Sequence, residues 1–218
     1  MKPHKIFEIY EDRRRIYTKS IVPGQAPFDE RIVKQGGEEF REFNPTRSKL
    51  AAMVMKGCTN TGIRSQDLIL YLGVSHGYTA SFVSDIIGPE GLIFGVDPAP
   101  RVMRDLVFLS QDRKNIAPIL ADANHPENYL GRVCLVDVVY QDIAQKNQAE
   151  IFIKNCNLFL RPGGYGLLTV KARSIDVKTK PKQIFNQIRK ELEEKFTVID
   201  FRILEPFEMD HCMIIVKK

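Results

Sequence analysis

The chain has 218 residues, 44% of them hydrophobic, and a formal net charge of +5, which excludes an intrinsically disordered protein and favours polyanionic partners only weakly. Its four cysteines form no C-x-x-C pair and no cluster with zinc spacing, so we expect a reduced intracellular protein without a bound metal. The first residues lack the apolar segment of a signal peptide, and no apolar run is long enough to span a membrane.

Residues 1–44 alternate apolar and charged side chains, a pattern typical of strands. We predict a small antiparallel β unit here, with turns at Asp12-Arg13, Pro23-Gly24 and Gly36-Gly37. The Arg13-Arg14-Arg15 run in the first turn is either a solvated turn or a contact to phosphate or protein.

The remaining residues, 45–218, form the predicted main domain. Its first segment indicates a helix over about 45–56, with cap-like Asn44 and Pro45 before it and Gly57 after it. Strands and helices then alternate, which indicates an α/β fold with a mostly parallel sheet covered on both faces. The predicted strands are 68–73, 91–97, 116–122, 133–142 and 163–172, with closing strands at 196–205 and 211–218, and the predicted helices are 79–87, 101–113, 147–160 and 182–195.

The carboxyl ends of the parallel strands are where ligands of such sheets bind. The first strand ends at Gly73, and the next three end at Asp97, Asp122 and Asp142. A dinucleotide fingerprint needs G-x-G-x-x-G, whereas here only Gly77 follows, four residues after the first glycine. Because three carboxylates would also repel a pyrophosphate, the pattern argues against a dehydrogenase.

A cationic nucleoside suits this acidic edge, and S-adenosylmethionine carries a sulfonium, a ribose diol, an adenine amine and a carboxylate. We expect Asp97 to accept the ribose hydroxyls and Asp122 the adenine amino group. The carboxylate would lie at the amino end of the helix that starts at Thr79. The closing β-hairpin is also typical of methyltransferase sheets, although any one of these aspartates could equally be a turn or cap residue.

Two lysines and a histidine stand where they could assist methyl transfer to a hydroxyl. Lys171 follows the fifth strand, Lys49 lies in the helix before the first strand, and His211 begins the last strand. A ribose hydroxyl must lose its proton as it accepts a methyl group, and a lysine can take that proton only if burial or a second cation lowers its pKa. We expect Asp142 to orient Lys171, and Lys49 either to be the second cation or to fix the hydroxyl, although each lysine alone is more typical of a surface residue.

Several segments, in order along nearly the whole chain, resemble the fibrillarin family: NPTRSKLAA, YLGVSHGYTASFVSDIIG, ADANHPENY, DVVYQDIAQKNQAEI, VKARSID and LEPFEMDHCMIIV. The resemblance implies a class I S-adenosylmethionine-dependent methyltransferase fold, Rossmann-like, that 2′-O-methylates ribose in pre-rRNA or tRNA. It further implies a box C/D ribonucleoprotein, in which a guide RNA selects the target RNA nucleotide and Nop5 (Nop56/58)-type and L7Ae-type proteins assemble the particle.

The resemblance also implies the site residues. The family's Lys-Asp-Lys-His catalytic set falls on Lys49, Asp142, Lys171 and His211. Cofactor contacts are expected at Gly73, Tyr78, Thr79, Asp97, Pro98, Asp122, Ala123, Asp142, Ile143, Ala144 and Gln145.

The chain departs from the family pattern at several of these positions. Tyr78-Thr79 stands where the family usually has Thr-Thr, and Asp97-Pro98 where it usually has Glu-Phe. Loss of that aromatic ring removes a stacking face for adenine, and Tyr78 is the candidate to replace it. His76, Phe82 and Lys146-Asn147 also differ from the family. We expect altered cofactor affinity with the chemistry retained.

Eukaryotic members of the family carry a Gly/Arg-rich amino-terminal tail, whereas this chain begins with the β unit. It therefore resembles the archaeal form, which implies a cytoplasmic location. RNA phosphates would meet basic side chains that flank the site in sequence, each of which is as readily an ordinary solvated residue. These are Arg47, Lys56, Arg173, Lys178, Lys180 and Lys182.

Two alternatives stay open. The glycine loop and the three aspartates would fit a methyltransferase for a protein or a small molecule equally well, and only the four-residue catalytic set favours ribose chemistry. The departures at Tyr78 and Asp97-Pro98 leave room for a non-catalytic assembly subunit with a methyltransferase fold.

Overall fold

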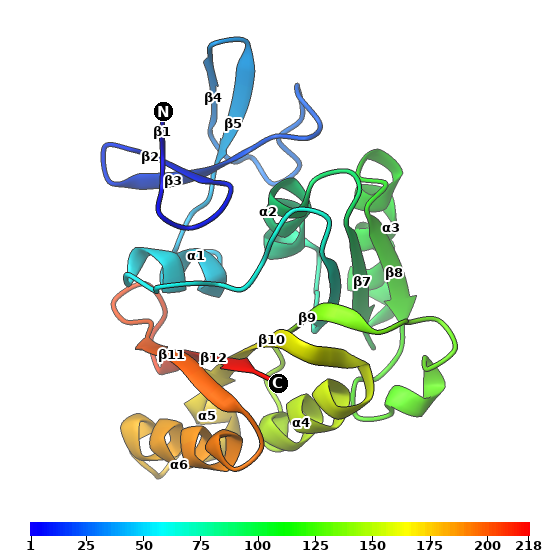
Figure 1. The fold of residues 1–218 in the computed structure, drawn as a ribbon, viewed down its shortest axis with the longest axis vertical. Coiled ribbons are helices and arrows are strands. Elements are labelled where there is room, and N and C mark those ends of the chain that lie inside the picture. The colour runs from blue at the N-terminus through cyan, green and yellow to red at the C-terminus, as the bar shows by residue number, and fades with distance from the viewer.

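The structure, a computed structural model, describes residues 1–218 and contains two β-sheets (Figure 1). The first sheet is antiparallel, in the order β1-β2-β3-β5-β4, which confirms the predicted amino-terminal β unit. It contains two tight hairpins, each closed by a two-residue turn with positive φ angles, at Arg13-Arg14 and at Gly36-Gly37. Its strands are β1 (Lys2–Pro3), β2 (Ile9–Asp12), β3 (Arg15–Lys19), β4 (Ile32–Gln35) and β5 (Glu38–Glu42).

The first helix is shorter than predicted, since α1 spans Lys49–Met55. Asn44 does not cap it, because its side-chain oxygen accepts the Thr46 amide at 2.9 Å and forms a turn. The N-cap is Ser48, and the helix ends before Gly57, whose φ of 79° suits the predicted end. The division of the chain into parts at residue 44 stays a prediction.

The second sheet has seven strands in the order β11-β12-β10-β9-β6-β7-β8, which confirms the predicted fold class. Strands β6 to β10 are parallel, and β12 runs antiparallel to both β10 and β11. Consecutive strands proceed in one direction from β6 through β7 to β8, and in the other from β9 to β10. The crevice of such a sheet lies beside this reversal. The strands are β6 (Leu68–Leu72), β7 (Leu92–Asp97), β8 (Ile116–Leu120), β9 (Val136–Gln141), β10 (Leu160–Lys171), β11 (Thr197–Ile203) and β12 (His211–Lys217).

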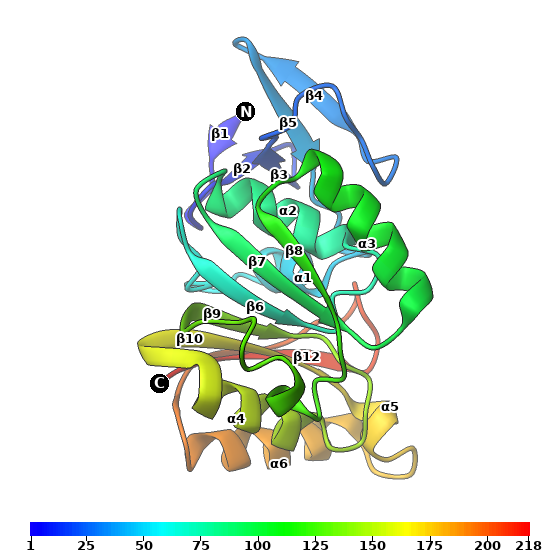
Figure 2. The same ribbon diagram turned by 90° about the vertical axis from the view of Figure 1, so that its right-hand side faces the viewer.

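Helices cover both faces of the large sheet (Figure 2). With α1, helices α2 (Tyr78–Ile87) and α3 (Pro100–Asp112) pack on one face, and α4 (Gln148–Phe159) and α6 (Pro181–Glu193) pack on the other. The short helix α5 (Ala172–Ile175) and a 3₁₀ turn at Pro126–Asn128 were not predicted. No helix is both long enough and apolar enough to cross a bilayer.

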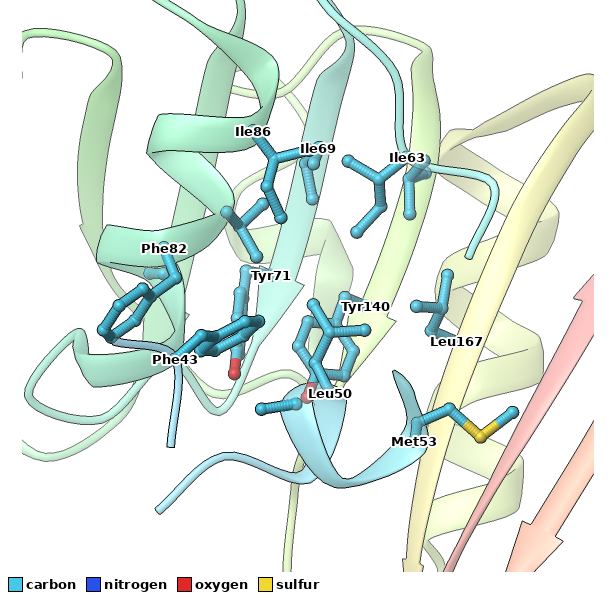
Figure 3. Close-up of a cluster of buried hydrophobic side chains, with 14 of the residues drawn as sticks. Phe43, Leu50, Met53, Ile63, Ile69, Tyr71, Phe82, Ile86, Tyr140 and Leu167 are labelled. Carbon is cyan, nitrogen blue, oxygen red and sulfur yellow. The ribbon is translucent and has the colours of Figure 1, made fainter. Parts of the chain in front are cut away.

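Alternate side chains of β6 enter the two cores. Ile69 and Tyr71 pack with the α1 and α2 layer, whereas Leu70 and Leu72 pack with the α4 and α6 layer. Figure 3 shows the first core, where the rings of Tyr71 and Tyr140 lie side by side with centroids 4.4 Å apart. An apolar run without alternation therefore reflects burial on both faces.

Strand ends differ from the sequence prediction. β10 begins at Leu160 and not at 163, because the chain stays extended through a register shift between Leu160 and Tyr165, where Gly163 has a φ of 77°. β9 begins three residues later than predicted, at Val136.

A buried network of charged side chains connects the small sheet with α2 and with Arg113, the residue that follows α3. Arg41 of β5 pairs with Asp85 of α2 at 2.6 Å and with Glu30, and all three side chains are at most 2% exposed. Arg113, after α3, donates to the other oxygen of Asp85 at 2.7 Å. Such pairs hold two elements in one arrangement, because moving either would leave a buried charge without a partner.

Candidate active site

The loop after β6 forms the floor of the site. Gly73 has a φ of 75°, and a Cβ there would lie 2.4 Å from the Asp142 carbonyl oxygen. Only glycine allows the loops after β6 and β9 to approach this closely. The predicted strand-end residues do converge here, on a cavity of about 310 Å³ lined by Gly73, Ser75, Val96, Asp97, Pro98, Asp122, Ala123, Asp142, Ile143, Ala144 and Gln145.

Two carboxylates in this smaller cavity are fixed by nearby amides. Asp97 accepts the backbone amides of Ser75 and Ala99, both at 3.0 Å. Asp122 accepts the backbone and side-chain amides of Asn124 at 2.9 and 3.0 Å, and these hydrogen bonds lower the pKa of its carboxyl. Both are thus held as oriented acceptors, which suits the hydroxyl and amine donors of a nucleoside.

Asn124 is a site residue that the sequence prediction missed. Its side chain links Asp122 to Gln145, which it meets at 2.8 Å, and accepts from Asn147 at 2.9 Å. The segment ADANHPENY contains it, but only the contact with the loop after β9 reveals its role.

A larger cavity of about 720 Å³ adjoins the first and shares three lining residues with it, namely Gly73, Ser75 and Asp142. Helix α2 begins in its wall, since Tyr78 and Thr79 line it. The N-cap, Gly77, provides no side-chain hydrogen bond to this helix. No side chain therefore occupies the first amides of α2, which begins at Tyr78, one residue before the predicted start. The binding of a carboxylate there stays a prediction.

Tyr78 does not lie where the sequence analysis placed it. Its ring packs against Phe28 and Phe82, with the Arg47 guanidinium 4.3 Å from its centroid, in the larger cavity. Asp122 lines the smaller cavity instead. The hypothesis that Tyr78 provides a stacking face for adenine beside Asp122 is therefore wrong in its geometry.

The structure arranges the four predicted catalytic residues as two pairs. Lys49 Nζ lies 3.0 Å from Asp142 Oδ2, and both side chains line the larger cavity about three-quarters buried. The sequence pattern predicts that Asp142 orients Lys171. That contact is absent because Leu168 pairs with Gln141, so Lys171 lies beyond the end of β9.

Lys171 and His211 form the second pair, as cross-strand neighbours in β10 and β12. Lys171 is exposed, whereas His211 is buried. Nδ1 of His211 lies 2.6 Å from the Met209 carbonyl oxygen and donates to it. In the neutral ring this leaves Nε2 as a hydrogen-bond acceptor.

The basic residues near the site fall into two groups. Arg47 donates to Phe28, Lys56 to the Glu205 carbonyl, and Arg173 to Asp210, so these three are held within the chain. The others are exposed and have no hydrogen bond or ion pair from their side chains: Lys178, Lys180 and Lys182.

The strand order, the uncapped start of α2 and the acidic strand ends together define a class I S-adenosylmethionine-dependent methyltransferase. A family model described as Fibrillarin matches residues 1–218. The chain belongs to the fibrillarin family, as its motifs predicted.

Relatives match over the full length. A protein of Thermococcus sibiricus named fibrillarin-like rRNA/tRNA 2′-O-methyltransferase is 49% identical and covers 100% of this chain and 99% of its own length. The structure of Aeropyrum pernix fibrillarin with natively bound S-adenosyl-L-methionine has a TM-score of 0.90 and 47% identity, covering 99% of this chain and 96% of that one. A fibrillarin/Nop5p complex contains a chain with a TM-score of 0.89 and 37% identity, covering 99% of both chains.

Proposed function

We propose that this chain is the catalytic subunit of a guide-directed RNA ribose 2′-O-methyltransferase that uses S-adenosylmethionine and acts on rRNA and tRNA. The observation that carries the proposal is Asp142, which lines both cavities and pairs with Lys49 at 3.0 Å. One carboxylate thereby faces both the cofactor cavity and the space where a hydroxyl would enter.

The residues present fit the cofactor. Asp97 and Asp122, oriented by their amide partners, would hold the ribose and adenine, and the free amides of α2 would hold the carboxylate. When bound, S-adenosylmethionine supplies an electrophilic methyl group on a sulfonium. The acidic lining favours that positive charge.

The four predicted catalytic residues would act on the ribose hydroxyl. Lys49 holds one oxygen of Asp142, which leaves Oδ1 free to accept the hydroxyl and fix its direction. The amine of Lys171 in its neutral form, or Nε2 of His211, would take the proton. The two groups are cross-strand neighbours in β10 and β12.

The proposed partners follow from the family. One relative is in complex with Nop5p, and we extend this to a Nop5 (Nop56/58)-type protein, an L7Ae-type protein and a box C/D guide RNA in the cytoplasm. Lys178, Lys180 and Lys182 are free to meet phosphates of the guide and target RNA.

Reconstitution tests the proposal. This chain would be combined with archaeal Nop5-type and L7Ae-type proteins, a box C/D guide RNA, labelled S-adenosylmethionine and a complementary target RNA. We expect one 2′-O-methyl group on the target and a loss of at least about a hundredfold in rate for Asp142→Asn, because the amide has a single acceptor oxygen and no charge, so it cannot hold both Lys49 and the hydroxyl. Cofactor binding without transfer to RNA would indicate a methyltransferase for another substrate, and absence of both would indicate an assembly subunit.

A further inference from the structure

Ser48 joins the two helices that border the larger cavity. It is 2% exposed and precedes Lys49, the first residue of α1. Its hydroxyl oxygen accepts the Ala51 amide at 3.4 Å, as an N-cap, and also accepts the Thr79 hydroxyl at 3.0 Å. Thr79 belongs to the first turn of α2. One buried oxygen therefore connects the first turns of α1 and α2.

Thr79 itself lines the larger cavity. The Tyr71 phenol lies beside the Thr79 hydroxyl and lines the same cavity as Lys49 and Asp142. Burial and the charge of Asp142 raise the pKa of Tyr71.

We propose that Ser48 is a positioning residue that holds Lys49 against Asp142 by tying α1 to the cofactor-binding end of α2. The lysine stem is flexible and loses rotamer entropy when it is ordered, so the backbone must place it well. Helix α1 has only seven residues and is too short to be stable alone. Its position is therefore set by the packing of its buried residues and by the contacts of its cap, of which Thr79 is the one that reaches the cofactor site.

Substitutions distinguish a Ser48 that only caps α1 from a Ser48 that also positions Lys49. Ser48→Gly retains most of the capping preference but removes the acceptor for Thr79. Ser48→Thr retains the hydroxyl. Thr46→Ala is the matched control, because it removes an exposed hydroxyl two residues earlier that contacts only Asn44.

The effect on methyl transfer rests on the proposed function, so the experiment has two independent readouts. The first is the single-turnover rate in the reconstituted particle at saturating cofactor and RNA. The second, which needs no RNA, is the acylation rate of Lys49 by a small amine-reactive reagent, followed by mass spectrometry of the full chain. Cofactor affinity is measured alongside by calorimetry.

We expect Ser48→Gly to lower the transfer rate roughly tenfold, because a reacting group is misplaced by less than 1 Å, and to change the affinity for S-adenosylmethionine by less than about twofold. Lys49 should be acylated several-fold faster once it is no longer held at Asp142. Ser48→Thr and Thr46→Ala should resemble the wild type in both readouts.

Wild-type transfer and acylation rates in Ser48→Gly would overturn the proposal. So would a rate defect that high cofactor concentration restores, since Ser48 would then act only on cofactor binding. If the wild type transfers no methyl group to RNA, the proposed function fails, and the acylation readout alone decides the role of Ser48.

Discussion

At the residue scale, the backbone at Gly73 lies so close to the Asp142 carbonyl oxygen that no side chain fits between them. Gly73→Ala would pay roughly 1–2 kcal/mol for the left-handed backbone and would also push the Asp142 carbonyl away from its position. We expect the affinity for S-adenosylmethionine to fall about tenfold or more, measured by calorimetry. Gly163→Ala is the matched control, since it has a similar φ of 77° with open space around it. Equal cofactor affinity in the two variants would contradict this role.

Asp67 gives a pH dependence at the same scale. Burial, together with the nearby charge of Asp137, raises the pKa of Asp67 from 3.8 to about 6. Between these values the folded chain keeps a proton that the unfolded chain has lost, so this group's contribution to stability falls as pH rises from about 4 to 6. The Asp67→Asn variant should therefore gain stability relative to the wild type across that window, with no further change above it.

Urea unfolding at pH 4, 5, 6 and 7 measures this difference. Comparison with the variant is needed because other carboxyls change the stability with pH in the opposite direction. Asp200 is one of them: burial alone would raise its pKa, but its hydrogen bonds with Thr59 and Arg202 outweigh burial, and the pKa is lowered. A constant difference between variant and wild type at all four values would show that Asp67 titrates normally.

The strand-end residues could be predicted because each stands at the end of an apolar run in the sequence. Gly73, Asp97, Asp122 and Asp142 were all found in this way, and all four line the smaller cavity. Contacts between loops far apart in sequence could not be predicted, and for this reason Asn124 was missed and the partner of Asp142 was assigned wrongly.

At the element scale, α2 shows where a sequence pattern is ambiguous. Its polar residues Ser81, Ser84 and Asp85 have the spacing typical of a solvent-facing stripe, yet all three are buried. The stripe faces Arg41 from the small sheet and Arg113 after α3. The helical spacing of apolar residues predicted that α2 exists. It could not predict that the polar residues are buried, because they contact a strand nearly 40 residues earlier in the sequence.

The charges around α2 predict a large effect of a single substitution. Arg41→Met would leave Glu30 buried without its partner and remove one of two arginines from Asp85, at a cost of about 3–5 kcal/mol in the free energy of unfolding. Arg15→Met, in the neighbouring strand, breaks a pair with Glu42 in which the arginine is half exposed, and should cost less than about 1 kcal/mol.

Urea unfolding at neutral pH distinguishes these two variants. If Arg41→Met proved as stable as Arg15→Met, the network would not be what holds the small sheet against α2. Cofactor binding in Arg41→Met should weaken as well, because α2 begins at the cavity wall.

At the scale of the whole molecule, the order of strands explains why residues distant in sequence meet. β6 lies between β7 and β9, so the loops after these three strands share one edge. The sequence indicated a sheet covered on both faces, and motif resemblance identified the family. Neither the pattern nor the resemblance predicted how the small sheet packs against α2. Glu30, just before β4, and Arg41 of β5 are charged, so the sequence alone indicates surface positions, yet both are buried with partners.

The position of the methyl group on a target RNA tests the central claim most directly. Two guide RNAs whose pairing with one target is displaced by a single nucleotide would be assembled separately with this chain and its archaeal partner proteins. We predict a 2′-O-methyl group that moves by one nucleotide with the guide and disappears in Asp142→Asn. A methyl group that stays at one nucleotide, or that appears on a base or on a protein, would contradict guide-directed ribose methylation by this chain.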